Sequence, residues 1–255
     1  GVLAKIEKPK ALTSLDRILE LSDALMVARG DLGVELPLES VPGVQKQITR
    51  AARKAGKPVV VATQMLESMI QSSTPTRAEV SDVATAVYDG ADAVMLSAES
   101  AAGAHPVESV TVMDRIARKV ESDVLYQSMI DAQRNPPEAT TPDAIMAAVH
   151  EVTQTVNAKA IICWTKSGST ALRAARERSR APIVAITPSI DTARRLALVW
   201  GLHCLTSDEV SNLDEMVDQA TAFAEREGFA QSGERVVITG GVPLGVTGTT
   251  NMLRV

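Results

Sequence analysis

The chain has 255 residues, a formal net charge of -5 and only 2% aromatic residues. This acidic balance and the scarcity of stacking rings argue against a nucleic-acid-binding protein, which usually has a basic face. No apolar run approaches the roughly 18 residues of a membrane-spanning helix, so no membrane partner is expected. Cys163 and Cys204 lie in apolar runs, which is typical of buried thiols in a reducing cytoplasm.

The first 125 residues alternate apolar strands with helices, which predicts four β/α units. The predicted strands cover residues 2–6, 24–28, 58–63 and 92–97, and the predicted helices cover 12–21, 41–55, 77–88 and 106–122. A closed eight-stranded barrel takes about 250 residues, and the chain opens on Gly1 directly into a strand. We therefore expect residues 1–134 to be the last four units of a (β/α)8 TIM barrel, in a chain that begins part-way through it.

A composition break follows over residues 135–141, where Pro and Thr concentrate and the apolar periodicity lapses. This segment is the predicted linker. Beyond it, helices are predicted at 142–156, 169–180, 191–200 and 212–228, and strands at 160–164, 183–186, 202–206 and 235–238, with 252–255 as a possible edge strand. The alternation predicts a second domain, residues 142–255, with three α/β/α layers.

Charged side chains follow the first two predicted strands. Lys5 and Glu7 are two residues apart, so they project to one face, and Asp31 comes shortly after the second strand. The carboxyl ends of barrel strands form the edge that carries chemistry. Glu7 and Asp31 offer two hard oxygen donors suited to Mg²⁺ or Mn²⁺, and Lys5 offers positive charge to a developing oxyanion. Either segment alone is more often a solvated pair or a turn, so the prediction depends on their combination.

A second candidate site lies at residues 164–170, where Ser, Thr, Gly and Lys residues follow an apolar strand and open a helix. Backbone N–H groups and hydroxyls at a helix start suit a phosphate. The same pattern also serves simply to cap a helix.

Several motifs, in order and with family-like spacing, closely resemble the pyruvate kinase family. They are KIE at 5–7, MVARGDLG at 26–33, ATQMLE at 62–67, PTRAE at 75–79 and DGADAVMLS at 89–97, and the resemblance extends over essentially the whole chain to TTNM at 249–252. It implies transfer of the phosphoryl group of phosphoenolpyruvate to ADP, giving pyruvate and ATP in glycolysis. It also implies a cytoplasmic homotetramer when full length, which uses Mg²⁺ or Mn²⁺ together with K⁺.

The resemblance assigns roles to individual residues of the first domain. Lys5 matches the catalytic lysine that stabilises the enolate and the phosphoryl group in flight, and Glu7 and Asp31 match the metal ligands. The backbone N–H groups of Gly30 and Asp31, with Thr63, match the site for the pyruvate carboxylate. The Thr63 hydroxyl is also linked to enol protonation, for which a water relay is the reasonable physical form.

Arg29 and Arg77 resemble positions at or near a subunit contact beside the active site, and the open alternative for both is an internal salt bridge. In the second domain, the residues that match the effector loop for a sugar phosphate or a nucleotide are Thr165, Lys166, Ser167, Gly168, Ser169 and Thr170. The loop at 240–245 is expected to face them. It lacks the Trp and Arg that accompany fructose 1,6-bisphosphate binding, and Ser169 stands where an Arg is common, which puts that effector in doubt.

The nucleotide contacts and K⁺ ligands of the family have no counterpart in this sequence. We therefore expect the chain alone to be inactive. Two alternatives remain: a noncatalytic phosphate-effector-binding and assembly module, and a metal-dependent enzyme of phosphoenolpyruvate or pyruvate that cleaves carbon–carbon bonds. The full motif set disfavours the second alternative.

Overall fold

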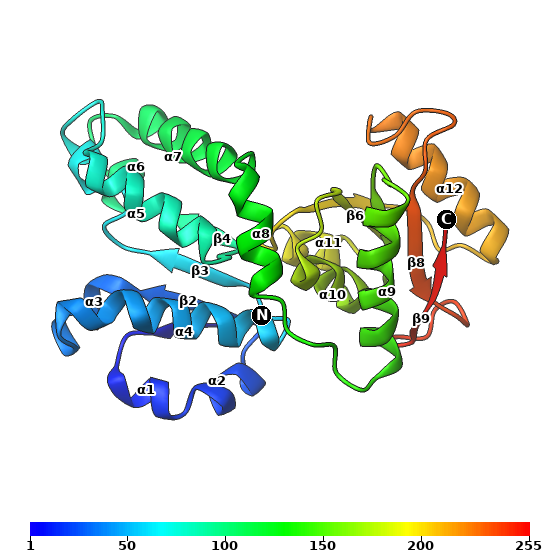
Figure 1. Cartoon of the computed structure of the whole chain (residues 1–255), viewed down its shortest axis with the longest axis horizontal. Helices are drawn as coiled ribbons and strands as arrows, with labels where there is room; N and C mark the ends of the chain where they lie inside the picture. The colour runs from blue at the N-terminus through cyan, green and yellow to red at the C-terminus, as the bar shows by residue number, and fades with distance from the viewer. The chain divides into compact units, whose positions relative to one another are not determined.

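Every residue from Gly1 to Val255 is described by the computed structural model, in which the chain folds as two units, Gly1–Gln133 and Arg134–Val255 (Figure 1). None of the helices combines the length and the apolar character needed to cross a membrane.

The first unit contains a four-stranded sheet in which every neighbouring pair is parallel. Its strands, in spatial and chain order, are β1 (Leu3–Ile6), β2 (Ala24–Ala28), β3 (Val59–Ala62) and β4 (Ala93–Met95). The register places Lys5 beside Met26 and Ala28 beside Ala62. The carboxyl ends of the strands therefore lie at one edge of the sheet, where the predicted site residues follow them.

Helices cover one face of this sheet. They are α1 (Pro9–Thr13), α2 (Leu15–Leu21), α3 (Arg29–Glu35), α4 (Val41–Lys54), α5 (Arg77–Tyr88), α6 (Ala98–Ala101), α7 (Pro106–Glu121) and α8 (Val124–Ala132), with short 3₁₀ turns η1 (Leu38–Ser40) and η2 (Glu67–Ile70). Ile48 of α4 and Val83 of α5 are buried in one apolar cluster with Val27 and Val61 of the sheet. Burying each such side chain stabilises the fold by about 1.5–3 kcal/mol.

The second unit contains a five-stranded sheet with the spatial order β7-β6-β5-β8-β9. Its strands are β5 (Ile161–Trp164), β6 (Ile183–Thr187), β7 (Leu202–Thr206), β8 (Val237–Gly241) and β9 (Thr250–Arg254). All pairs are parallel except β8 with β9, which is antiparallel. The chain runs from β5 outward to β7 and then returns to place β8 on the other side of β5, so the strand order reverses between β5 and β8.

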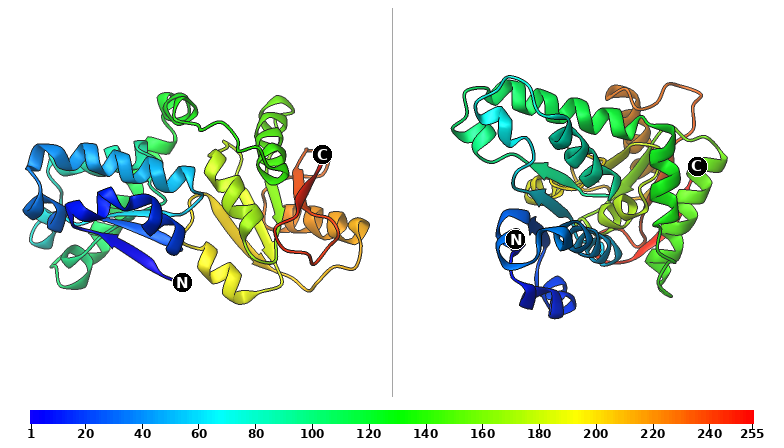
Figure 2. Two further views of the ribbon diagram at one scale, coloured as in Figure 1. Left: turned by 90° about the horizontal axis from the view of Figure 1, so that it is seen from below. Right: turned by 60° about the vertical axis from the view of Figure 1, so that its left-hand side comes forward.

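This sheet separates two apolar clusters, because successive strand residues point to opposite faces. Ile161 and Cys163 face one cluster, and Ile162 faces the other. On the first face pack α9 (Thr141–Thr155), α10 (Ser169–Glu177) and α11 (Ile190–Leu196); on the second packs α12 (Leu213–Arg226), as Figures 1 and 2 show from three sides. The predicted α/β fold class, with a parallel partial-barrel sheet followed by three α/β/α layers, is confirmed.

Several predicted boundaries were wrong. The predicted helix 12–21 is two helices, α1 and α2, which meet at Ser14, and α3 and α8 were not expected. The last parallel strand lies at Val237–Gly241, two to three residues beyond its predicted place, because Gly240 and Gly241 pair with β9 and continue the ladder. The helix predicted to reach residue 180 ends at Glu177, since Arg178 has a left-handed backbone (φ 53°).

Candidate functional site

Three predicted side chains meet at the carboxyl ends of β1 and β2. The Lys5 ammonium donates hydrogen bonds to Asp31 Oδ2 at 3.0 Å and to Glu7 Oε2 at 3.3 Å. Lys5 lies on β1, Glu7 directly follows that strand, and Asp31 lies in the first turn of α3, which begins where β2 ends. Asp31 is in a helix rather than in the turn that was the alternative for it, and the three groups lie together as predicted.

The charges in this cluster stabilise one another. Hydrogen bonding to Asp31 and then to Glu7 raises the pKa of Lys5, and the bond from Lys5 lowers the pKa of Asp31. Lys5 and Asp31 are each about half exposed, so solvent screens the attraction. The lysine remains a cation and Asp31 an anion across the physiological pH range.

The cluster fits a divalent cation with two protein ligands. The ammonium of Lys5 lies between two carboxylates that converge on it, which shows that a positive charge is accommodated there. No group of three or more His, Cys, Asp and Glu side chains in the chain could hold a metal. Glu7 and Asp31 could thus provide only part of a coordination shell, as Mg²⁺ sites completed by substrate and water do.

Gly30 brings the α3 backbone against Thr63. A Cβ atom built on Gly30 would lie 2.7 Å from Thr63 Cγ2, closer than real contacts allow, so any side chain at position 30 would force the threonine to shift. The N–H groups of Gly30 and Asp31 lie in the first turn of α3, where backbone N–H groups have no carbonyl partner within the helix. Two backbone donors and the Thr63 side chain therefore lie next to the Lys5 cluster.

Arg29 holds the chain around Thr63 in place. Its guanidinium donates to the carbonyl oxygen of Thr63 at 2.7 Å and to that of Ala62 at 3.3 Å, and it forms an ion pair with Asp82 of α5 at 2.6 Å. Thr63 and Gln64 both have left-handed backbones, with φ of 78° and 57°. Such conformations cost non-glycine residues about 1–3 kcal/mol each unless neighbours fix them.

The two arginines expected near a subunit contact differ in their surroundings. Arg29 makes the internal salt bridge that was the alternative for it, whereas Arg77 is exposed in the first turn of α5. Asp82 was missed by the sequence analysis because no local signal connects a helical aspartate with an arginine 53 residues earlier.

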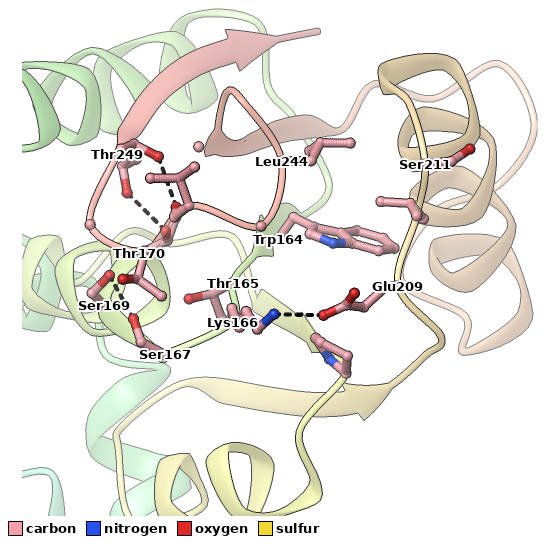
Figure 3. Close-up of a pocket in the computed structure, with 18 residues that line it drawn as sticks. Trp164, Thr165, Lys166, Ser167, Ser169, Thr170, Glu209, Ser211, Leu244 and Thr249 are labelled. Atoms are coloured by element: carbon pink, nitrogen blue, oxygen red, sulfur yellow. Dashed lines mark hydrogen bonds and ion pairs between the residues drawn. The ribbon is translucent and has the colours of Figure 1, made fainter.

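A cavity of about 210 Å³ opens in the second unit at the carboxyl ends of β5 and β8 (Figure 3). Loops that follow β5, β7 and β8 enclose it, and the reversal of strand order between β5 and β8 makes this the position where open α/β sheets bind ligands. Of the six residues predicted for an effector loop, all but Gly168 line it. The 240–245 loop contributes Gly241, Leu244 and Gly245, so it faces the first loop as expected.

Hydroxyls and one ammonium group give this cavity its polar character. Ser167 and Ser169 hydroxyls lie 3.2 Å apart, and the buried Thr170 hydroxyl is hydrogen-bonded to that of Thr250 at 2.8 Å. Gly168 does not line the cavity, but its left-handed backbone (φ 92°) makes the turn, and its N–H donates to Thr165 Oγ1.

One acidic side chain that the sequence analysis missed faces the lysine of this loop. Lys166 Nζ lies 2.7 Å from Glu209 Oε1, and this ion pair lowers the pKa of Glu209. The pair connects the loop after β5 with the loop after β7 (Figure 3). No spacing in the sequence could indicate that Glu209 pairs with Lys166, because only the folded chain places the loop after β7 beside the loop after β5.

Family models match both units. A model described as pyruvate kinase, barrel domain, matches residues 1–110, and a model described as pyruvate kinase, alpha/beta domain, matches residues 143–255.

Proteins of similar sequence and structure agree with these matches. A protein named pyruvate kinase from Methylorubrum extorquens is 61% identical over 100% of this chain and 53% of its own length, and one from Agrobacterium vitis is 52% identical over 100% of this chain and 54% of its own. A crystal structure of a pyruvate kinase from Cryptosporidium parvum superposes with a TM-score of 0.89 at 38% identity, covering 99% of this chain and 50% of that one. The chain spans about half the length of the curated relatives it matches.

Proposed function

Because the chain belongs to the pyruvate kinase family, we propose that it carries part of the site at which the phosphoryl group of phosphoenolpyruvate passes to ADP, giving pyruvate and ATP. The observation that supports this proposal is the convergence of Lys5, Glu7 and Asp31 at the carboxyl ends of two adjacent parallel strands. Phosphoryl transfer depends mainly on positioning and on neutralising the charge of the transferred group. This cluster has the charges that such a reaction needs.

The proposed roles follow from the position of each group. Glu7 and Asp31 would hold Mg²⁺ or Mn²⁺, which supplies charge neutralisation when it is bound. Lys5 stays protonated and donates hydrogen bonds to the oxygens on which negative charge develops, in place of the carboxylates it contacts now. The N–H groups of Gly30 and Asp31, with Thr63, would hold the substrate carboxylate, and Thr63 would deliver a proton to the enolate through a water molecule.

Replacing Lys5 tests the central role. In a protein of the relatives' full length that carries this sequence, Lys5→Met should lower kcat by at least about 10²-fold, the usual effect of removing one oxyanion-stabilising donor. Lys10→Met removes the same charge from α1, away from the cluster, and should leave kcat unchanged. Retention of full turnover by Lys5→Met would refute the assignment.

Metal binding can be measured on the chain itself. Glu7→Gln and Asp31→Asn should each weaken Mn²⁺ binding. Binding is measured by electron paramagnetic resonance, because the signal of the free ion disappears when the ion binds. Glu20→Gln, an exposed acid on α2, is the control that should not weaken binding. Equal Mn²⁺ affinity in all these proteins would contradict the proposed ligands.

We also propose that the chain alone does not turn over substrate, since it spans about half of its relatives' length. A coupled assay of the purified chain with phosphoenolpyruvate, ADP, Mg²⁺ and K⁺ should give no pyruvate, and measurable turnover would overturn the proposal. In the whole protein we propose a cytoplasmic homotetramer, with exposed Arg77 near a subunit contact.

A second function is favoured by the cavity at the strand-order reversal of the second unit. We propose that it binds a phosphate-bearing effector, a sugar phosphate or a nucleotide, through Lys166 and the hydroxyls of its loop. Glu209 would compete with the ligand for the Lys166 ammonium, which has three N–H donors and is half exposed. A thermal-shift screen of sugar phosphates and nucleotides should find a stabilising compound, and Ser167→Glu should abolish the shift by placing a carboxylate in the cavity.

A further inference from the structure

The residues that open the second unit are held by an arginine between two helices. Arg134 Nε donates to Glu177 Oε2 of α10 at 2.7 Å, and its Nη1 donates to Glu151 Oε1 of α9 at 2.8 Å. The Arg134 side chain is 22% exposed and that of Glu177 only 7%. Glu151 is 67% exposed, so water screens its pair with Arg134, whereas the pair with the buried Glu177 is screened less and is the stronger of the two.

Further charges fix the partners of Arg134. Arg176 pairs with Glu177 at 3.5 Å and with Asp143 at 3.1 Å, and Arg173 pairs with Asp143 at 3.0 Å. Three arginines and three carboxylates thus form one balanced network that joins the start of α9 to the last turns of α10. A movement of Glu177 together with Arg134 would break the ion pair between Glu177 and Arg176.

The residues after Arg134 lie along α9. Asn135, Pro136 and Pro137 line a groove together with Ala147, Ala148 and Glu151 of that helix. The small alanine side chains allow the segment to approach the helix, and consecutive prolines restrict its backbone to extended conformations. Little conformational entropy is therefore lost when the segment is held there. Figure 1 shows the extended chain between α8 and α9.

We propose that residues 134–137 form a strap that Arg134 fastens to α9 and α10. The Pro- and Thr-rich segment is then part of the second unit rather than a free linker. This proposal does not depend on the proposed function.

Hydrogen exchange of the whole chain tests the strap. In Arg134→Met, the four amides of this stretch, those of Asn135, Glu138, Ala139 and Thr140, should exchange about five- to tenfold faster, as expected when a local contact of this strength is lost. Cleavage after Glu138 by a glutamyl endopeptidase should accelerate by a similar factor. Arg118→Met breaks an ion pair with Asp114 on the exposed surface of α7, and it should leave both rates unchanged.

The protection of β6 shows whether a variant affects the strap or the whole unit, because this strand is fully buried. Faster exchange at 135–140 with β6 still protected supports the strap. Unchanged exchange at 135–140 in Arg134→Met, or free-chain exchange there in the unmodified protein, overturns it. If β6 also loses protection in Arg134→Met, the variant Arg134→Lys is measured instead, because lysine keeps the charge but cannot bond two carboxylates as the guanidinium does. The amides within 135–140 must then exchange faster than in the unmodified protein. Equal exchange overturns the proposal.

Discussion

Arg29 shows how one side chain can hold a strained segment. The two left-handed residues after β3, Thr63 and Gln64, are not glycines, so their conformation needs support from outside the loop. Arg29 supplies it through the Ala62 and Thr63 carbonyls, and Asp82 fixes the guanidinium. The arginine thereby holds the backbone that carries the Thr63 side chain.

Lysine cannot replace this arginine. Arg29→Lys keeps the positive charge but cannot bond two carbonyls and a carboxylate at once, so it should lower the free energy of unfolding of the first unit by about 1–3 kcal/mol. Urea unfolding measures the change. Arg17→Lys, at an exposed pair with Glu20, should alter stability by less than about 0.5 kcal/mol. Equal effects of the two substitutions would contradict the role of Arg29.

Asp143 should make the second unit sensitive to acid. Burial works to raise its pKa, but Arg176 and Arg173 outweigh burial and hold that pKa below the ordinary value of 3.8. The stabilisation is therefore present above pH 3.8 and is lost as the pH falls through the lower pKa of the folded state. Unfolding free energies measured from pH 7 to pH 3 should fall less steeply in Asp143→Asn. Asp214→Asn, at a side chain that is 93% exposed, should keep the slope of the unmodified protein.

At the scale of elements, Glu79 connects α5 to the loop before it. One carboxylate oxygen accepts from the Ser68 N–H at 2.7 Å, and the other accepts from the Ser68 hydroxyl at 2.6 Å and the Thr76 N–H at 2.7 Å, which completes the capping box of α5. Because Glu79 serves both the η2 turn and the helix, Glu79→Ala should destabilise the first unit by about 2 kcal/mol, more than a helix cap alone. Thermal unfolding followed by circular dichroism checks this, with Glu20→Ala as the control. A loss no larger than that of the control would show that the two elements are not joined here.

The sequence predicted the strands better than the short helices. An apolar run such as Val59–Ala62 is stable only when it is buried, so its position in a central strand can be predicted from its composition. By contrast, α3 contains Gly30 and Gly33, which weaken helix propensity, and it forms because Leu32 packs into the core. The Lys5, Glu7 and Asp31 cluster was predictable because parallel strands end at one edge. Asp82 and Glu209 were not, since each is brought to its arginine or lysine only by the folded chain.

At the scale of the whole molecule, each of the two sheets ends in strands that are paired on one side only. Strand β1 is an edge of the first sheet, paired only with β2, and Val2 and Leu3 at its start are 60% and 38% exposed. Unprotected parallel edges promote association between chains.

The isolated chain should therefore self-associate through β1. Sedimentation velocity should show a weight-average mass that rises with concentration above 27.0 kDa, and Leu3→Lys should reduce this rise by placing a charge at the edge. Leu38→Lys changes a side chain that is 74% exposed away from this strand, and it should have no effect. A chain that stays monomeric at all concentrations would contradict the prediction.

The contact between Gly30 and Thr63 makes the two positions dependent on each other during sequence divergence. Gly30 does not have a positive φ, so only the Thr63 methyl group excludes a side chain there. Gly30→Ala alone should cost about 1–3 kcal/mol through overpacking, whereas Thr63→Ser, which removes the methyl but keeps the hydroxyl, should restore most of that loss in the double variant. A double-mutant cycle in urea measures the coupling, and simple additivity would disprove it. Any lineage that acquires a larger residue at position 30 must first, or at the same time, have shortened the side chain at position 63.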